Sequence, residues 1–158
     1  MEDKTEKIYL RKLDDSLMKE YLDLRVFDFQ KTFIETPKGS LEDKERRGWD
    51  IDWTIECIFA GGKMAGYAMY GESKDGYVWL DRFMTDRRFQ KRGIGKAALS
   101  LIIEKLKKLY PDRKKILLSV VPENKNAIKL YEKAGFVRTG KFDEGEEVMY
   151  LSEDTPDA

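Results

Sequence analysis

The sequence predicts a single-domain α/β (α+β) protein, with one mixed, mostly antiparallel sheet of about six or seven strands and flanking helices. The length of 158 residues is typical of one domain, and 41% apolar residues with 12% aromatic residues can build a packed core. Three strand-like segments joined by glycine turns predict an antiparallel meander. One strand–helix–strand segment, residues 78–121, is long enough to connect a parallel pair.

The N-terminal third predicts one strand and two helices. A weakly alternating segment favours a strand, and apolar residues at helical spacing favour an amphipathic helix with Asp15 or Ser16 as its N-cap. A turn follows, and a variant capping box from Ser40 to Asp43 then opens a short charged helix. The expected ranges are a strand at 8–13, a helix at 16–29, a turn at 36–39 and a helix at 40–47.

The rest of the chain predicts the meander, the crossover and a final strand pair. Glycines at 61, 62 and 76 mark the meander turns, and an apolar stripe marks the long helix. Gly135 is suited to the C-cap of the second helix. The expected strands are 53–60, 64–71, 77–85, 115–121, 136–142 and 148–151, and the expected helices are 93–110 and 124–134.

The composition excludes several classes of protein and site. The sequence has no histidine, which removes a Ser-His-Asp triad and a histidine-ligated metal, so we expect no metal. The single cysteine, Cys57, cannot form an internal disulfide and has no histidine to activate it, which favours a buried structural thiol. The charged start and the lack of a long apolar run predict a cytoplasmic protein with no membrane segment.

The charge is balanced in total but not along the chain. The sequence holds 30 basic and 30 acidic residues, so the formal net charge is zero. Residues 87–96 include five basic residues and no acidic one, whereas residues 143–158 include seven acidic residues and no basic one. Because screening limits each charge to about 10 Å, the basic segment predicts a local site for an anion. It is short and has one aromatic residue, Phe89, so we expect no nucleic-acid partner.

The most informative segment is a basic loop in which two glycines, Gly93 and Gly95, open the long helix. Glycine lets backbone N–H groups turn toward an anion, and a helix N-terminus adds partial positive charge, which suits a pyrophosphate. A Walker A loop is excluded, because Gln90 and Ala97 stand where it needs glycine and Ser or Thr. The dinucleotide fingerprint matches formally at residues 93–98, but the chain has only one crossover and so lacks the second mononucleotide-binding half that this fold needs.

A third pattern, Gln90-x-x-Gly93-x-Gly95, resembles the acetyl-CoA-binding motif of the GCN5-related N-acetyltransferase (GNAT) family. The segment 124–136, Asn-Lys-Asn-Ala-Ile-Lys-Leu-Tyr-Glu-Lys-Ala-Gly-Phe, looks like the second signature of that family. The resemblance implies a GNAT fold over residues 1–152, with its parallel strand pair split at the acetyl-CoA site. It leaves residues 153–158 as a loose acidic tail. It also implies acetyl-CoA as cosubstrate and makes a homodimer plausible.

The resemblance assigns acetyl-CoA contacts residue by residue. It implies that the strand end pairs with the pantetheine arm, that Asn124 binds the same arm, and that Tyr131 lies near the thioester sulfur. The loop implied to hold the pyrophosphate comprises Gln90, Lys91, Arg92, Gly93, Ile94, Gly95 and Lys96, and the strand end comprises Phe83, Met84 and Thr85.

Acetyl transfer to an amine needs a neutral amine, a stabilised oxyanion and a proton for the leaving thiolate. A carboxylate can bind the ammonium group and then accept its proton. Tyrosine, with an unperturbed pKa near 10, can protonate a thiolate, so Tyr131 is the candidate general acid. The expected oxyanion donor is a backbone N–H near Phe83 or Met84. The structural alternative for Tyr131 is packing in the core beside Phe136.

Three further segments, 30–36, 40–44 and 78–83, resemble bacterial spermine/spermidine and diamine acetyltransferases. A polyamine is a flexible polycation, and Glu35 and Asp81 are the carboxylates expected to bind it and assist catalysis. Trp79 is expected to provide a cation–π wall, as Tyr77 could, although both fit core packing. Asp81 and Arg82 could also form a structural ion pair. Weaker acidic candidates are Asp28, Glu72 and the C-terminal acidic residues from 143 onward.

Two other functions remain open at the level of sequence. One is acetylation of a protein N-terminus, a lysine or an aminoglycoside, which would need a wider groove than a polyamine. The other is a non-catalytic module that only binds CoA, although the presence of Tyr131 and Asn124 disfavours it. The width of the groove therefore decides between the acceptors.

Overall fold

The structure, a computed structural model, describes residues 7–46 and 51–153, which form a seven-stranded mixed sheet in the order β1-β2-β3-β4-β5-β7-β6. The expected meander and the one parallel pair, β4 with β5, are both present. The strands are β1 Ile8–Lys12, β2 Thr54–Ala60, β3 Lys63–Glu72, β4 Tyr77–Thr85, β5 Lys115–Val120, β6 Phe136–Asp143 and β7 Glu146–Leu151. The α-helices are α1 Met18–Leu22, α2 Pro37–Glu45, α3 Ile94–Leu109 and α4 Lys125–Lys133.

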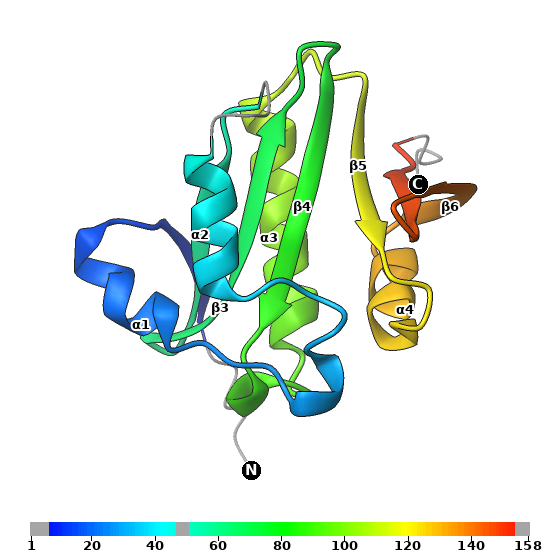
Figure 1. The fold of residues 1–158 in the computed structure, drawn as a ribbon. Helices are drawn as coiled ribbons and strands as arrows, with labels where there is room; N and C mark the ends of the chain where they lie inside the picture. The colour runs from blue at the N-terminus through cyan, green and yellow to red at the C-terminus, as the bar shows by residue number, and fades with distance from the viewer. Residues whose placement is uncertain (1–6, 47–50, 154–158) are drawn as a thin grey trace.

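Helices cover both faces of the sheet (Figure 1). On one face α3 and α4 bury the largest apolar cluster, which includes Leu80, Leu99 and Ile116. On the other face α1 and α2 cover a second cluster around Tyr21, Tyr67 and Met84. The alternation of side chains along each strand therefore supplies two cores, as expected for a sheet between two layers of helices.

The sheet opens between β4 and β5. Their parallel pairing runs only from Tyr77↔Lys115 to Trp79↔Leu117, after which the two strands diverge (Figure 1). The β3–β4 register also shifts there, because Met69 pairs with Arg82 and Tyr70 pairs with Leu80, which leaves Asp81 as an extra residue in β4. A β-bulge of this kind bends a strand and redirects side chains beside a site.

Two expected elements of the N-terminal third were wrong. The helix predicted at 16–29 ends at Leu22, and a short 3-10 helix, η2 Asp28–Gln30, follows it. The backbone there bonds instead to the residues that follow β4: the Arg25 N–H donates to the Asp86 carboxylate at 2.8 Å, and the Arg87 N–H donates to the Arg25 carbonyl at 2.7 Å. Tertiary hydrogen bonds therefore override helical spacing here.

The turn predicted at 36–39 is the start of α2. Thr36 is its N-cap, with its hydroxyl accepting from the Gly39 N–H at 2.9 Å, and Pro37 stands at the first helical position. Proline is suited to that position because its missing N–H would have no helical partner. The remaining elements match to within one or two residues, and residue 47 lies outside the described residues. Within the described ranges, no helix is long and apolar enough to cross a membrane.

Candidate active site

The glycine loop, residues 90–96, joins the end of β4 to α3. A 3-10 helix, η3 Arg87–Phe89, leads into it, and Lys91 and Gly93 both have left-handed backbones, with φ of 62° and 78°. Gly93 is the N-cap of α3, and an added Cβ there would meet no atom within 4 Å. The loop therefore presents successive N–H groups beside a helix N-terminus, which is a suitable geometry for an anion.

The side chains of Gln90 and Phe89 fix the glycine loop to the fold. The Gln90 amide donates to the Thr85 carbonyl at 2.9 Å and exchanges hydrogen bonds of 2.9 and 3.0 Å with the Gln30 amide in η2. The guanidinium groups of Arg88 and Arg92 lie over the Phe89 ring. The side chain of Gln90 thus positions the loop, and Gln30 is a partner that the sequence reasoning did not single out.

A cavity of about 720 Å³ opens where β4 and β5 separate. We call it the acidic cavity, because its lining includes six acidic side chains against three basic ones. The acidic residues are Glu35, Asp43, Asp81, Asp143, Glu144 and Glu146, and the basic residues are Lys31, Arg46 and Arg82. These groups come from α2, β4, the β6–β7 hairpin and the segments before α2, so the fold gathers charges that are distant in sequence.

The acidic cavity brings together one set of the predicted site residues. Those lining it are Glu35, Trp79, Asp81, Phe83, Asn124 and Tyr131. Met84 instead packs in the cluster under α1. Thr85 is the last residue of β4, and a Cβ on Gly95 would come within 3.2 Å of its hydroxyl. Trp79 lines the cavity and also packs against the core, which confirms the packing interpretation, and its cation–π role stays a prediction.

Tyr131 lies on α4 between the core and the acidic cavity. Its ring packs edge-on against Phe136, with centroids 5.9 Å apart, and only 8% of the residue is exposed. Burial, and secondarily the charge of Glu146, raises the pKa of the Tyr131 phenol, so it stays protonated at neutral pH. Asn124 lines the same cavity and is the N-cap of α4, with its amide oxygen accepting from the Ala127 N–H.

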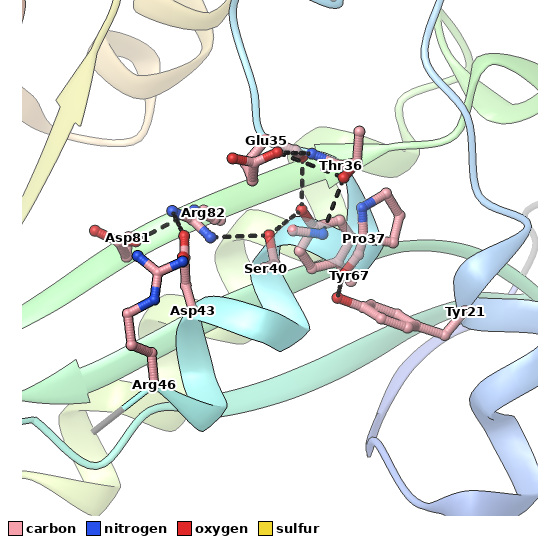
Figure 2. A network of polar contacts seen from close by, with 11 residues as sticks. Tyr21, Glu35, Thr36, Pro37, Ser40, Asp43, Arg46, Tyr67, Asp81 and Arg82 are labelled. Carbon is pink, nitrogen blue, oxygen red and sulfur yellow. Dashed lines mark hydrogen bonds and ion pairs between the residues drawn. The ribbon is translucent and has the colours of Figure 1, made fainter. Parts of the chain in front are cut away.

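Arg82 joins α2 to β4 on one wall of the acidic cavity (Figure 2). Its guanidinium donates to Asp43 at 2.7 Å and to the Ser40 hydroxyl at 3.1 Å, and its Nε lies 3.3 Å from the Asp81 carboxylate. The Ser40 hydroxyl bonds to Tyr67, whose own hydroxyl donates to the Glu35 carbonyl at 3.0 Å. The ion pair of Asp81 with Arg82 is therefore one part of a network that fixes this wall.

The carboxylate of Asp81 has a raised pKa. Burial is the largest cause, Arg82 opposes it, and the negative charges of Glu146 and Asp43 add to it. A carboxyl group whose pKa moves toward neutrality is better matched to accepting a proton from an amine. Asp81 thus combines a position in the cavity with an environment typical of an acid–base group.

Glu35 is exposed at the mouth of the acidic cavity, and its carboxylate is turned toward the start of α2 (Figure 2). One oxygen accepts from the Thr36 N–H at 2.9 Å, and the side chain lies against Gly39. Its charge reaches the cavity, but its hydrogen-bonding capacity is partly used by the helix.

Other candidates lie away from the acidic cavity. Asp28 is exposed and pairs with Lys31 at 2.9 Å, Glu72 is exposed at the end of β3, and the Tyr77 ring faces Lys114. Cys57 is fully buried in β2, and burial raises the pKa of its thiol to about 12, which confirms a structural thiol. In residues 7–46 and 51–153, no three acidic or cysteine side chains are grouped to hold a metal ion.

The β6–β7 hairpin contributes more to the acidic cavity than the sequence indicates. In the sequence Asp143, Glu144 and Glu146 are only weaker candidates within an acidic run, yet all three line the acidic cavity. The signal in the sequence was the turn at Glu144 and Gly145. In the structure these two residues have φ angles of 50° and 84°, and the turn returns the chain to the sheet. A hairpin returning beside β5 places its charges at the open part of the sheet.

The chain matches the model of the acetyltransferase (GNAT) family over residues 15–136. A spermine/spermidine N(1)-acetyltransferase of Bacillus subtilis (strain 168) is 37% identical over 150 residues, which covers 90% of this chain and 96% of that protein. A probable spermine N(1)-acetyltransferase of Bacillus subtilis subsp. natto (strain BEST195) is 36% identical, with the same coverage.

Solved structures share the fold at lower identity. Spermidine N-acetyltransferase from Vibrio cholerae, in complex with CoA and spermine, has a TM-score of 0.69 at 17% identity, covering 91% of this chain and 94% of that one. The ribosomal-protein-S18-alanine N-acetyltransferase from Escherichia coli has a TM-score of 0.66 at 21% identity, covering 95% and 99%. At these identities the likeness establishes the fold and does not distinguish between acceptors.

Proposed function

The chain belongs to the acetyltransferase (GNAT) family, and we propose that it acetylates a primary amine of a polyamine such as spermidine or spermine, or of a diamine. It is an acetyl-CoA-dependent N-acetyltransferase. The relatives of 36–37% identity are named for spermine or spermine/spermidine, which supports the polyamine as acceptor.

The observation that carries this proposal is the acidic lining of the cavity next to Tyr131. A polyamine carries several ammonium groups on an apolar chain, and carboxylates on several sides of a cleft can bind more than one of them. Trp79 adds an aromatic wall that suits both the methylene chain and a cation.

The residues present fit acetyl-CoA as the acetyl donor. The glycine loop offers N–H groups, a helix N-terminus and the basic residues Lys91, Arg92 and Lys96 to a pyrophosphate. β4 has no strand partner in β5 beyond Trp79, so Phe83 to Thr85 leave a strand edge for the pantetheine amides. The thioester would then reach the cavity near Asn124 and Tyr131.

The proposed reaction is direct attack of the amine on the thioester. Asp81 binds the ammonium group and takes its proton, and the free amine nitrogen forms a bond to the acetyl carbon. A backbone N–H near Phe83 or Met84 stabilises the oxyanion. As the carbon–sulfur bond breaks, Tyr131 donates its proton to the thiolate, and its raised pKa keeps that proton in place beforehand. The phenolate then takes the second proton of the acetylated nitrogen, which gives the neutral amide and restores Tyr131.

A panel of acceptors tests the proposal. Release of free thiol from acetyl-CoA is measured with spermine, spermidine, diamines, an aminoglycoside, lysine peptides and a peptide with a free N-terminus. We expect the highest kcat/KM with a polyamine or diamine. Activity confined to peptides or to the aminoglycoside would replace the polyamine as acceptor.

Three wider expectations belong to the same proposal. We propose that the enzyme acts in the cytoplasm, that it forms a homodimer, and that residues 1–152 are the catalytic domain, with 153–158 outside it. Light scattering coupled to gel filtration tests the dimer. Removal of residues 153–158 tests the boundary, because the truncated chain loses the ion pair between Glu153 and Arg113 but is expected to keep its kcat.

A further inference from the structure

We propose that Glu146 is a second catalytic carboxylate, which binds the reacting ammonium group opposite Asp81 and is positioned by Ser119. This inference rests on the proposed function, because it needs an amine in the acidic cavity. It identifies a residue that the motifs of the loop and of α4 do not contain.

The position of Glu146 follows from strand pairing. Glu146 begins β7, which pairs with β5 antiparallel, with Ser119 opposite Val148 and Val120 opposite Glu147. Along β7, Glu147, Met149 and Leu151 are buried, whereas the alternate positions from Glu146 are only half-buried. In β5, Ser119 is likewise half-buried between the buried residues Leu118 and Val120. Ser119 and Glu146 therefore share a face of the sheet, and both line the acidic cavity.

A hydrogen bond fixes the carboxylate of Glu146. The Ser119 hydroxyl donates to its Oε1 at 2.9 Å. The neighbouring Glu147 has a different environment, since its side chain is buried and bonds to Arg138 and to the Gly140 N–H. Of these two adjacent glutamates, only Glu146 lines the cavity.

The split in the sheet puts Glu146 and Asp81 on opposite sides of one opening. Asp81 projects from the bulge of β4, and Glu146 comes from the β7 side, beyond β5. Tyr131 also lines this opening, and the Glu146 charge acts on both Tyr131 and Asp81. An ammonium group that enters the opening near Tyr131 can thus contact a carboxylate from either side.

Asp43 and Glu146 both add negative charge near Asp81, and of the two only Glu146 lies across the acidic cavity from it. On the α2 side, Arg82 is bonded to Asp43 as well as lying beside Asp81, and the Tyr67 hydroxyl is part of the same network. Arg46 also lies 3.6 Å from Asp43. The negative charge of Asp43 is therefore largely offset on its own wall, whereas the Glu146 carboxylate accepts a hydrogen bond from the neutral Ser119 hydroxyl.

The two carboxylates then have different tasks in one proton transfer. The ammonium group binds between them, one of its protons passes to Asp81, and the nitrogen lone pair that this frees attacks the thioester carbon. Glu146 keeps its negative charge throughout, which strengthens ammonium binding and favours protonation of Asp81. The carbon–sulfur bond breaks as Tyr131 protonates the thiolate, and the resulting phenolate takes the second proton from the acetylated nitrogen. Asp81 then releases its proton to solvent, so one ammonium group and one thioester give one amide, one thiol and one proton.

The test measures kcat/KM for spermidine against pH in four proteins: wild type, Glu146→Gln, Ser119→Ala and Glu144→Gln. Glu146→Gln removes a negative charge near Asp81, which lowers the pKa of Asp81, so the acid limb of the profile is expected to move to lower pH. kcat/KM at pH 7 should fall about tenfold to a hundredfold. Ser119→Ala keeps the charge but frees the carboxylate, so it should change both quantities in the same direction and by less.

Glu144→Gln is the matched control, because it removes the same charge from the same hairpin and the same cavity. It can raise the KM for spermidine, but we expect its acid limb to stay where the wild-type limb lies. The KM for acetyl-CoA is measured in each variant and is expected to stay within twofold. If Glu146→Gln does not fold, the acid limb of Ser119→Ala decides the question.

The activity of the wild-type protein distinguishes a failure of the proposed function from a failure of the inference about Glu146. If wild type acetylates none of the polyamines or diamines, the proposed function is wrong. If wild type acetylates spermidine but Glu146→Gln keeps both its acid limb and its kcat/KM, Glu146 only orders the hairpin through Ser119 and the inference is wrong. An equal shift in Glu144→Gln would also overturn it, because the effect would then be general to the charge of the cavity.

Discussion

The glycine loop and the acidic cavity adjoin the same strand, β4, but are built in different ways. The glycine loop is one continuous segment whose shape comes from backbone angles, with Lys91 and Gly93 at positive φ. The acidic cavity is assembled from side chains of α2, β4, β5, α4 and the β6–β7 hairpin. The first region presents N–H groups to an anion, and the second presents carboxylates to a cation.

Because of this difference, substitutions in the two regions should affect different steps of the reaction. A change in the glycine loop should act through backbone conformation and affect the acetyl donor. A change in the acidic cavity should act through charge or proton transfer and affect the amine or the chemical step. Kinetic constants measured separately for acetyl-CoA and for spermidine therefore test whether the two regions act independently.

The largest effect is expected for Tyr131→Phe, which removes the proposed proton donor and keeps the ring against Phe136. We expect kcat to fall about a hundredfold or more, because general acid catalysis contributes roughly 10²–10⁴ in rate. The KM for acetyl-CoA should change less than twofold. Steady-state kinetics with both substrates varied provide the measurement.

A control variant on the same helix is Glu132→Gln, an exposed neighbour of Tyr131, which should keep wild-type kcat. Thermal unfolding of Tyr131→Phe shows whether packing is preserved. An unchanged kcat in that variant would return Tyr131 to a purely structural role in the core.

The next effect is expected for Gly93→Ala in the glycine loop. No atom lies within 4 Å of the added Cβ, so the cost is that of a left-handed backbone, about 1–2 kcal/mol. We expect the KM for acetyl-CoA to rise about fivefold to tenfold and the KM for spermidine to stay near wild type.

Gly62→Ala is a close control, because Gly62 also has positive φ and open space for a Cβ but lies in the β2–β3 hairpin. It should lower the Tm by a similar amount and leave both KM values unchanged. If Gly93→Ala loses stability and keeps its acetyl-CoA KM, the backbone of the glycine loop is not part of the donor site.

Most of the fold could be predicted, because its signals are local. The meander turns at Gly61, Gly62 and Gly76 all have the positive φ that their sequence context indicated. The stripe of α3 is a repeated pattern over many residues, so its ends were found to within one residue. The helix at 16–29 failed because Asp86, sixty-one residues after Arg25, takes that backbone N–H.

The candidate site divides in the same way. The glycine loop could be predicted from a short motif, because its geometry depends on adjacent residues. The acidic cavity could be predicted only in part: Asp81 and Glu35 were chosen by resemblance, whereas Asp43, Glu146 and Ser119 were not. Their contribution depends on the bulge at Asp81 and on the pairing of β7 with β5, and no local pattern encodes either feature.

A smaller effect is expected for Gln30→Ala. The Gln30 side chain links the segment before α2 to the glycine loop. The variant removes the paired hydrogen bonds with Gln90. A net loss of about 1 kcal/mol predicts a rise of about fivefold in the KM for acetyl-CoA. Asp28→Asn is the control in the same 3-10 helix, since its exposed ion pair with Lys31 should contribute almost nothing. A larger change in the spermidine KM than in the acetyl-CoA KM would contradict the assignment of Gln30 to the loop.

The smallest effect is expected for Glu35→Gln at the mouth of the acidic cavity. The amide oxygen can still accept from the Thr36 N–H, so the start of α2 is preserved and only the charge is lost. An exposed charge contributes about 0.5 kcal/mol, so the KM for spermidine should rise about twofold, with the acetyl-CoA KM unchanged. Glu42→Gln, an exposed residue of α2 that does not line the cavity, should change neither constant. A rise well above twofold would mean that Glu35 turns from α2 to meet the amine directly, and the mouth of the cavity would then bind the substrate as strongly as its interior.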